Sequence, residues 1–243
     1  MQMHANNRVP RTAWLVAIAA LTVLQTQARA VLNWNFNSPP ANGYTIQEII
    51  DNQGLRVGDK VFTSFDVVSF GTGGALAPQA TDIRVRGFIE DDGSIGLDFN
   101  GAWFANIGQA VNTTIEFAVT ADDPFVIDGV GLSLDAVGGL GNGAISIAEQ
   151  VEDVPGGTVL TDPTLFVFYQ RNNPFNQFDD FGSFDPIKSI YVTKDITVTS
   201  GGQGIAHLSK FSQTFRQVPE PGTLVLAAGG MLVVLTRRRR SAA

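Results

Sequence analysis

The 243-residue sequence contains no cysteine and only two histidines. The lack of cysteine excludes a disulfide framework, a thiolate zinc site, an iron–sulfur cluster and a cysteine nucleophile. His4 lies in the N-terminal segment before residue 30, so a catalytic triad in the rest of the chain would depend on His207 alone. We interpret His207 as a surface residue of a strand, and we expect no histidine metal site, no cofactor and no enzymatic activity.

Basic side chains are also few, and they are unevenly distributed. The net charge of the chain is −7, but residues 31–216 hold nine Lys or Arg against 22 Asp or Glu, a net charge of −13. Residues 1–30 and residues 217–243 each carry a net charge of +3. The acidic middle segment excludes nucleic acid as the expected partner, because phosphate binding needs clustered Lys and Arg. The asymmetry indicates three segments in different environments.

Residues 1–30 have the features of a secretory signal peptide. Arg8 and Arg11 precede an apolar run at 13–24. Small residues at Ala28 and Ala30 suit a signal peptidase that cuts after Ala30. The run is shorter than the roughly 20 residues that span a bilayer. We therefore expect a signal helix that is removed on export, the alternatives being a short buried helix or a retained anchor.

Residues 217–243 combine three features in a fixed order. They are a proline-rich sequence (Val218, Pro219, Glu220, Pro221, Gly222), an uncharged apolar run at 223–236, and an arginine cluster (Arg237, Arg238, Arg239, Arg240). We expect the run to form a short transmembrane helix, with the bilayer thinned around it and the arginines on the cytoplasmic side. The prolines keep the preceding peptide extended. Such a peptide, exposed just outside a membrane, is accessible to a processing enzyme.

These three features resemble the PEP-CTERM sorting signal of Gram-negative bacteria. The resemblance implies recognition by exosortase, a membrane-embedded cysteine protease-transpeptidase, with processing near residues 219–221. It also implies transient anchoring in the inner membrane, followed by association with extracellular polysaccharide at the cell surface or in the biofilm matrix. The alternative is an ordinary C-terminal tail anchor. The resemblance concerns the destination of the protein and leaves the activity of the exported part open.

Residues 31–216 are expected to fold as the exported domain. Apolar and polar residues alternate at period two in short runs, a pattern typical of strands. The runs cover 60–70, 82–89, 95–100, 114–119, 130–135, 144–151, 165–170, 189–199 and 205–215. One short helix is predicted over 45–53, where Thr45 and Glu48 form a capping box, Gly54 suits the helix end, and Ile46, Ile49 and Ile50 form the buried face. The pattern predicts an all-β domain, an antiparallel β-sandwich or jelly roll.

Acidic pairs in predicted loops are the candidates for chemistry. They are Asp91/Asp92, Asp122/Asp123 and Asp179/Asp180. Paired carboxylates are the minimum for glycoside hydrolysis, but a domain with 22 acidic residues contains such pairs by chance. Asp179, Asp180 and Asp185 are calcium candidates, because loops supply oxygen ligands to hard cations, although the order of an EF-hand is missing.

Aromatic residues are the candidates for sugar binding. Trp34, Trp103 and the loop at 171–178 offer rings that could stack on sugars, or they pack in the core. The glycine-rich run at 138–143 lacks the spacing of a phosphate loop and predicts a long hairpin loop. We expect a structural or adhesive role in extracellular matrix. A carbohydrate- or calcium-binding module is the alternative, and a glycan-active enzyme is the least favoured interpretation.

Overall fold

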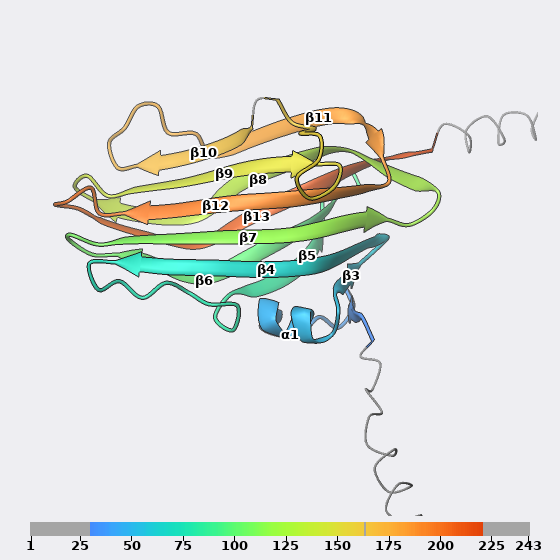
Figure 1. Ribbon diagram of the computed structural model, residues 1–243, viewed down its shortest axis with the longest axis horizontal. Coiled ribbons are helices and arrows are strands. Elements are labelled where there is room, and N and C mark those ends of the chain that lie inside the picture. Colours follow the sequence, from blue (N-terminus) through green and yellow to red (C-terminus); the bar gives the residue numbers. More distant parts are fainter. Residues whose placement is uncertain (1–29, 163, 221–243) are drawn as a thin grey trace, which may run out of the picture.

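The computed structural model describes residues 30–162 and 164–220, which form two β-sheets packed face to face (Figure 1). The elements are β1 (Leu32–Trp34), β2 (Tyr44–Thr45), α1 (Ile46–Asp51), β3 (Leu55–Val57), β4 (Lys60–Thr72), β5 (Arg84–Ile89), β6 (Ile95–Ala105), β7 (Ala110–Ala121), β8 (Phe125–Leu140), β9 (Ala144–Glu152), β10 (Leu165–Gln170), β11 (Asp179–Ile187), β12 (Ser189–Thr199) and β13 (Ile205–Pro219). The predicted all-β fold with one short helix is confirmed. The predicted signal helix and transmembrane helix lie outside the described residues. Within the described part of the chain, no helix has the length and apolar character needed to cross a membrane.

One sheet has seven strands in the order β1-β3-β4-β7-β12-β9-β10, and the other has six in the order β11-β8-β13-β6-β5-β2. The β1–β3 pair is parallel, which makes the first sheet mixed rather than purely antiparallel. The other named pairs are antiparallel. Along β7 every second residue is buried, as expected for a strand with one face on the core.

Aromatic rings from both sheets meet in the core. Phe62 of the seven-stranded sheet lies 5.4 Å from Phe215 of the six-stranded sheet, measured between ring centroids. Phe117 and Phe99 make a second cross-sheet contact at 5.9 Å, and Phe99 stacks on Phe211 at 4.8 Å. All five rings are fully buried, so this cluster joins the two sheets.

A polar network is buried beside the aromatic cluster. Lys194 of β12 binds the carboxylate of Glu149 on β9, and Gln213 of β13 donates to the other oxygen of Glu149 at 2.6 Å. The ammonium of Lys194 also lies 5.9 Å from the ring centroid of Phe211. Burial raises the pKa of Glu149 and lowers the pKa of Lys194, while their mutual attraction opposes both shifts. The network therefore links the two sheets through groups that are costly to leave unpaired.

Helix α1 begins with the predicted capping box. The Glu48 amide donates to Thr45 Oγ1 at 3.1 Å, and the Thr45 amide donates to Glu48 Oε2 at 2.7 Å. Ile46 and Ile49 are buried as expected, but Ile50 is 37% exposed, so the predicted buried face was one residue too wide. Residues one position apart on a helix cannot both point directly at the core.

One segment predicted as a loop is a strand, and another is partly a strand. Asp179 and Asp180 lie in β11, an edge strand whose one partner among the described strands is β8. This strand could not be predicted from the sequence, because both of its faces are partly exposed and apolar residues do not alternate clearly with polar ones. In the glycine-rich run, β8 extends to Leu140, and the imidazole of His207 occupies the space where a side chain at Gly138 would lie. Gly138 therefore lies in a strand, where its lack of a side chain allows close packing against His207, and it is not part of a flexible loop.

Candidate functional site at the end of the last strand

Strand β13 runs directly into the proline-rich sequence. Its last residues pair with β8, in the register Gln217 to Ile127 and Val218 to Val126. Pairing with β6 on the other side ends at Phe215, so β8 alone among the described strands holds this segment. The peptide before Pro219 is extended, as the sequence predicts, and it is also paired with β8.

The position of Pro219 explains how a proline can end this strand. The Glu220 amide donates to the Pro124 carbonyl at 2.7 Å, so it points toward β8. Successive amides of a strand point to opposite sides, and the nitrogen of Pro219 therefore faces the side that β6 has left. A proline at that position removes no ladder hydrogen bond.

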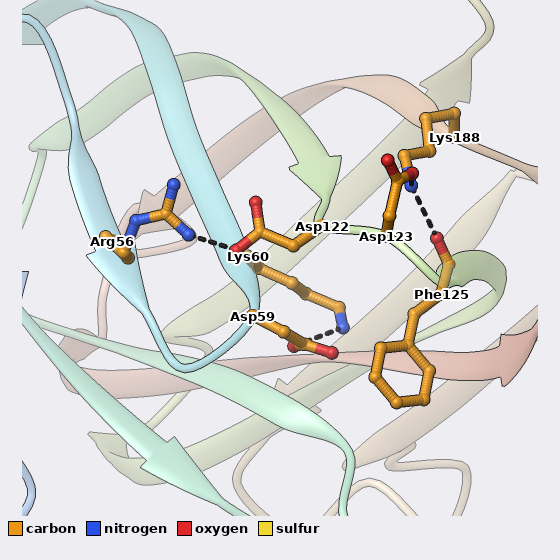
Figure 2. A network of polar contacts seen from close by, with 7 residues as sticks. All are labelled: Arg56, Asp59, Lys60, Asp122, Asp123, Phe125 and Lys188. Carbon is orange, nitrogen blue, oxygen red and sulfur yellow. Dashed lines mark hydrogen bonds and ion pairs between the residues drawn. The ribbon is translucent and has the colours of Figure 1, made fainter.

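Lys188 connects Glu220 to the folded domain through an ion pair. Its ammonium binds the carboxylate of Asp123, donates to the Phe125 carbonyl at 3.1 Å and lies 3.6 Å from Glu220 Oε1. The hydrogen bond to Asp123 is the main reason that the pKa of Lys188 is raised. Figure 2 shows Lys188 beside Asp123, which lies in the turn that joins β7 to β8, and beside Phe125 at the start of β8. We call Asp123, Lys188 and Glu220 the latch.

A second contact holds the same segment from inside the sandwich. The fully buried Lys60 binds the side-chain oxygen of Gln217, and its ammonium lies 3.2 Å from Asp59 Oδ1 (Figure 2). Burial lowers the pKa of Lys60, while the nearby charge of Asp59 opposes this shift. Gln217 therefore faces the interior and Glu220 contacts Lys188, so the end of β13 is held at two points.

The calcium candidates are spread along β11. Asp179 accepts a hydrogen bond from Ser133 Oγ at 2.6 Å, and Asp180 accepts from the Phe166 amide at 2.8 Å. Neighbouring strand residues point to opposite faces, so Asp179 and Asp180 do not converge, and Asp185 lies farther along the same strand. In the described ranges, no group of three or more His, Asp or Glu residues has the geometry to hold a metal ion. Calcium binding at these residues stays a prediction.

The other candidates are placed as follows. Trp34 is 7% exposed and Trp103 is fully buried, which agrees with a role in the core. His207 is exposed on β13, and Phe175 is exposed in the loop before β11. Ala30 is exposed at the start of the described chain. Outside the described residues lie Ala28, Pro221, Gly222, Arg237, Arg238, Arg239 and Arg240.

The groups that hold the end of β13 were not predicted from the sequence. Lys188 is 65 residues from Asp123, and Lys60 is 157 residues from Gln217. No local pattern marks such partners, because strand pairing alone brings them together. An isolated lysine next to a predicted strand is the only signal that the sequence offers.

Comparison with known proteins identifies the C-terminal segment that begins at residue 217. Residues 217–240 match the family model described as the PEP-CTERM protein-sorting motif. No curated protein matches the chain.

Three of the solved structures that match the chain have TM-scores of 0.28 or less. The enzymatically active domain of tailspike protein 4 from bacteriophage CBA120 matches 62% of this chain at 14% identity and a TM-score of 0.28, and the match spans 19% of that chain. TmCBM61, solved with β-1,4-galactotriose, matches 63% of this chain and 88% of its own at 13% identity and a TM-score of 0.28. The C-terminal CBM6 of LamC from Zobellia galactanivorans matches 61% of this chain and 99% of its own at 10% identity and a TM-score of 0.25.

The match to the family model and the contacts at the end of β13 concern the same residues. Residues 217–220, which Lys188 and Lys60 hold against the sandwich, are the first residues of the PEP-CTERM protein-sorting motif that this chain carries.

Proposed function

We propose that this protein is a surface or matrix protein that is exported, anchored transiently in the inner membrane and processed by exosortase near residues 219–221. The observation that carries the proposal is the match of residues 217–240 to the sorting motif. In this scheme residues 1–30 direct export and are removed by signal peptidase. Residues 223–236 then hold the protein in the membrane, and Arg237 to Arg240 stay on the cytoplasmic side.

The geometry of the junction adds a step to this scheme. A processing enzyme needs the peptide free of other backbone partners, but residues 217–219 pair with β8 and Glu220 donates to Pro124. We therefore expect the end of β13 to detach from β8 before processing. The rest of β13 lies between β8 and β6, so the sandwich can remain folded while this end detaches.

For the folded part we propose a structural or adhesive role in the polysaccharide matrix. Two large sheets joined by an aromatic core make a rigid module that needs no disulfide, and its acidic charge favours solubility. A carbohydrate- or calcium-binding role is the second candidate. The half-exposed ring of Phe181 in a surface groove favours carbohydrate over calcium.

The test follows the size and location of the full chain in cells with and without exosortase. We expect Glu220→Ala, or deletion of residues 223–243, to leave the protein unprocessed or misplaced. Asp195→Ala, an exposed acidic position on β12, is the matched control and should be processed normally. Identical processing in cells that lack exosortase would refute the sorting proposal.

A further inference from the structure

The outer face of the six-stranded sheet carries a groove that is separate from the sorting segment. It is lined by the turn at 90–94 between β5 and β6 and by Phe181 of β11. Ser133 of β8 and Thr214 and Arg216 of β13 also line it. The groove has a volume of about 450 Å³, within the roughly 300–1,000 Å³ that is usual for ligand sites. We call it the outer-face groove.

The ring of Phe181 is fixed in position and still accessible. A Cβ atom at Gly129 of β8 would lie 2.7 Å from Phe181 Cζ, so only a glycine leaves room for the ring to lie across β8. The guanidinium carbon of Arg216 lies 4.9 Å from the ring centroid, and Arg216 Nε donates to Asp128 Oδ1 at 2.9 Å. Phe181 is nevertheless 50% exposed. A ring held this way loses little conformational freedom when a ligand stacks on it.

Polar groups that line the groove are available to a ligand. The side chains of Glu90, Asp91 and Thr214 make no hydrogen bond or ion pair with any other residue that the structure describes. Asp92 accepts from the Ser94 amide at 2.8 Å, a contact within the turn that lines the groove. The groove thus combines one apolar ring with hydroxyl groups and carboxylate oxygens that can accept hydrogen bonds.

The chemistry of the lining selects the ligand. Three carboxylates in the turn disfavour an anion, and an open groove with a single apolar wall does not suit a lipid chain. A sugar ring matches the lining, because it has an apolar C–H face for Phe181 and hydroxyl groups for the carboxylates. We propose that the outer-face groove binds a neutral saccharide unit of a polysaccharide, with Phe181 stacking on the sugar and Glu90 and Asp91 accepting its hydroxyl hydrogens. This inference rests on the proposed matrix location.

The test uses the full chain, purified in a polyoxyethylene detergent so that no sugar head group competes. The probes are galactan, mannan, xylan and dextran, with chitosan as a cationic probe, and binding is measured by titration calorimetry with a chelator present. We expect at least one neutral polysaccharide to bind, and Phe181→Ala to weaken that binding by about tenfold. Phe181→Trp should preserve binding, and Glu90→Gln should weaken it several-fold.

Phe166→Ala is the matched control, because Phe166 is an exposed phenylalanine of β10 that does not line the groove. It should bind as the wild type does, and all variants should melt at similar temperatures. The proposal is overturned if no neutral probe binds, if Phe181→Ala binds normally, if the chelator abolishes binding, or if only chitosan binds. Processing of the same variants by exosortase is measured in parallel. Loss of sugar binding with normal processing refutes the groove alone, whereas wild-type protein that exosortase leaves unprocessed refutes the sorting proposal.

Discussion

A disulfide between β13 and β8 would test whether the start of the sorting motif must detach. Gln217 and Ile127 are opposed in the register of these strands, and the chain has no cysteine that could interfere. Opposed residues of an antiparallel pair lie about 4.5–5.5 Å apart between Cα atoms, within the range of about 4.4–6.8 Å that a disulfide requires. In an oxidising compartment, the double variant Ile127→Cys/Gln217→Cys should therefore form a disulfide that holds the end of β13 against β8.

The contacts at the junction set the size of the effect. Detachment breaks the Glu220–Pro124 hydrogen bond, the backbone bonds around Val218 and the Lys60–Gln217 contact, each about 1 kcal/mol. The Lys188–Glu220 ion pair adds only a few tenths, because both side chains are more than one-third exposed. A total of about 2–4 kcal/mol corresponds to a detached fraction of roughly 0.1–3%. The disulfide removes this fraction, so we expect processing to slow by about tenfold or more.

The assay is a pulse-chase measurement of the size change in cells that contain exosortase, with and without a membrane-permeant reductant. Single variants at residues 127 and 217 control for the substitutions themselves. Ser133→Cys/Ser212→Cys, another opposed pair of β8 and β13, controls for cross-linking these strands away from the motif. Both controls should be processed normally, and reductant should restore processing of the locked protein. Wild-type rates for the oxidised, locked protein would refute the requirement for detachment.

Two further predictions concern stability. Lys194→Met should lower the free energy of unfolding by about 3–5 kcal/mol, because it leaves the charge of Glu149 buried without its partner. Glu149→Leu/Lys194→Met should cost less, about 1–3 kcal/mol, because only the buried amide of Gln213 then loses its partner; chemical denaturation of the full chain compares them. Comparable losses in both variants would contradict this reasoning. Burial, together with a hydrogen bond to Glu116, raises the pKa of Tyr191 from 10.0 to about 12. The contribution of Tyr191 to stability is thus complete below about pH 10 and lost as pH rises through about 12, and Tyr191→Phe should remove this dependence in denaturation measured against pH.

Much of the fold follows from local patterns. The alternation in β7 and β12 predicts strands with one buried face, and the structure has that alternation in both. The capping box at Thr45 and Glu48 predicts the start of α1, since both hydrogen bonds form within four residues. The sorting segment is recognisable because its proline, apolar and arginine features follow one another directly in the sequence.

Features that depend on strand pairing could not be predicted in this way. The latch joins Lys188 to Asp123 across 65 residues, and the position of Phe181 over Gly129 depends on the register of β11 against β8. The alternation of β12 places Lys194 on the buried face, but its partners Glu149 and Gln213 can be identified only once β9 and β13 are positioned around it. Side-chain networks of this kind can be predicted only after the order and register of the strands are known.

The mass of the mature protein tests the central claim most directly. Mass spectrometry of the protein recovered from cells with exosortase should find a chain that ends near residues 219–221 and lacks Arg237 to Arg240. The same measurement in cells without exosortase should find the sorting segment intact. A mature protein that retains the arginine cluster in exosortase-containing cells, or the same shortened chain in both cell types, would contradict the account.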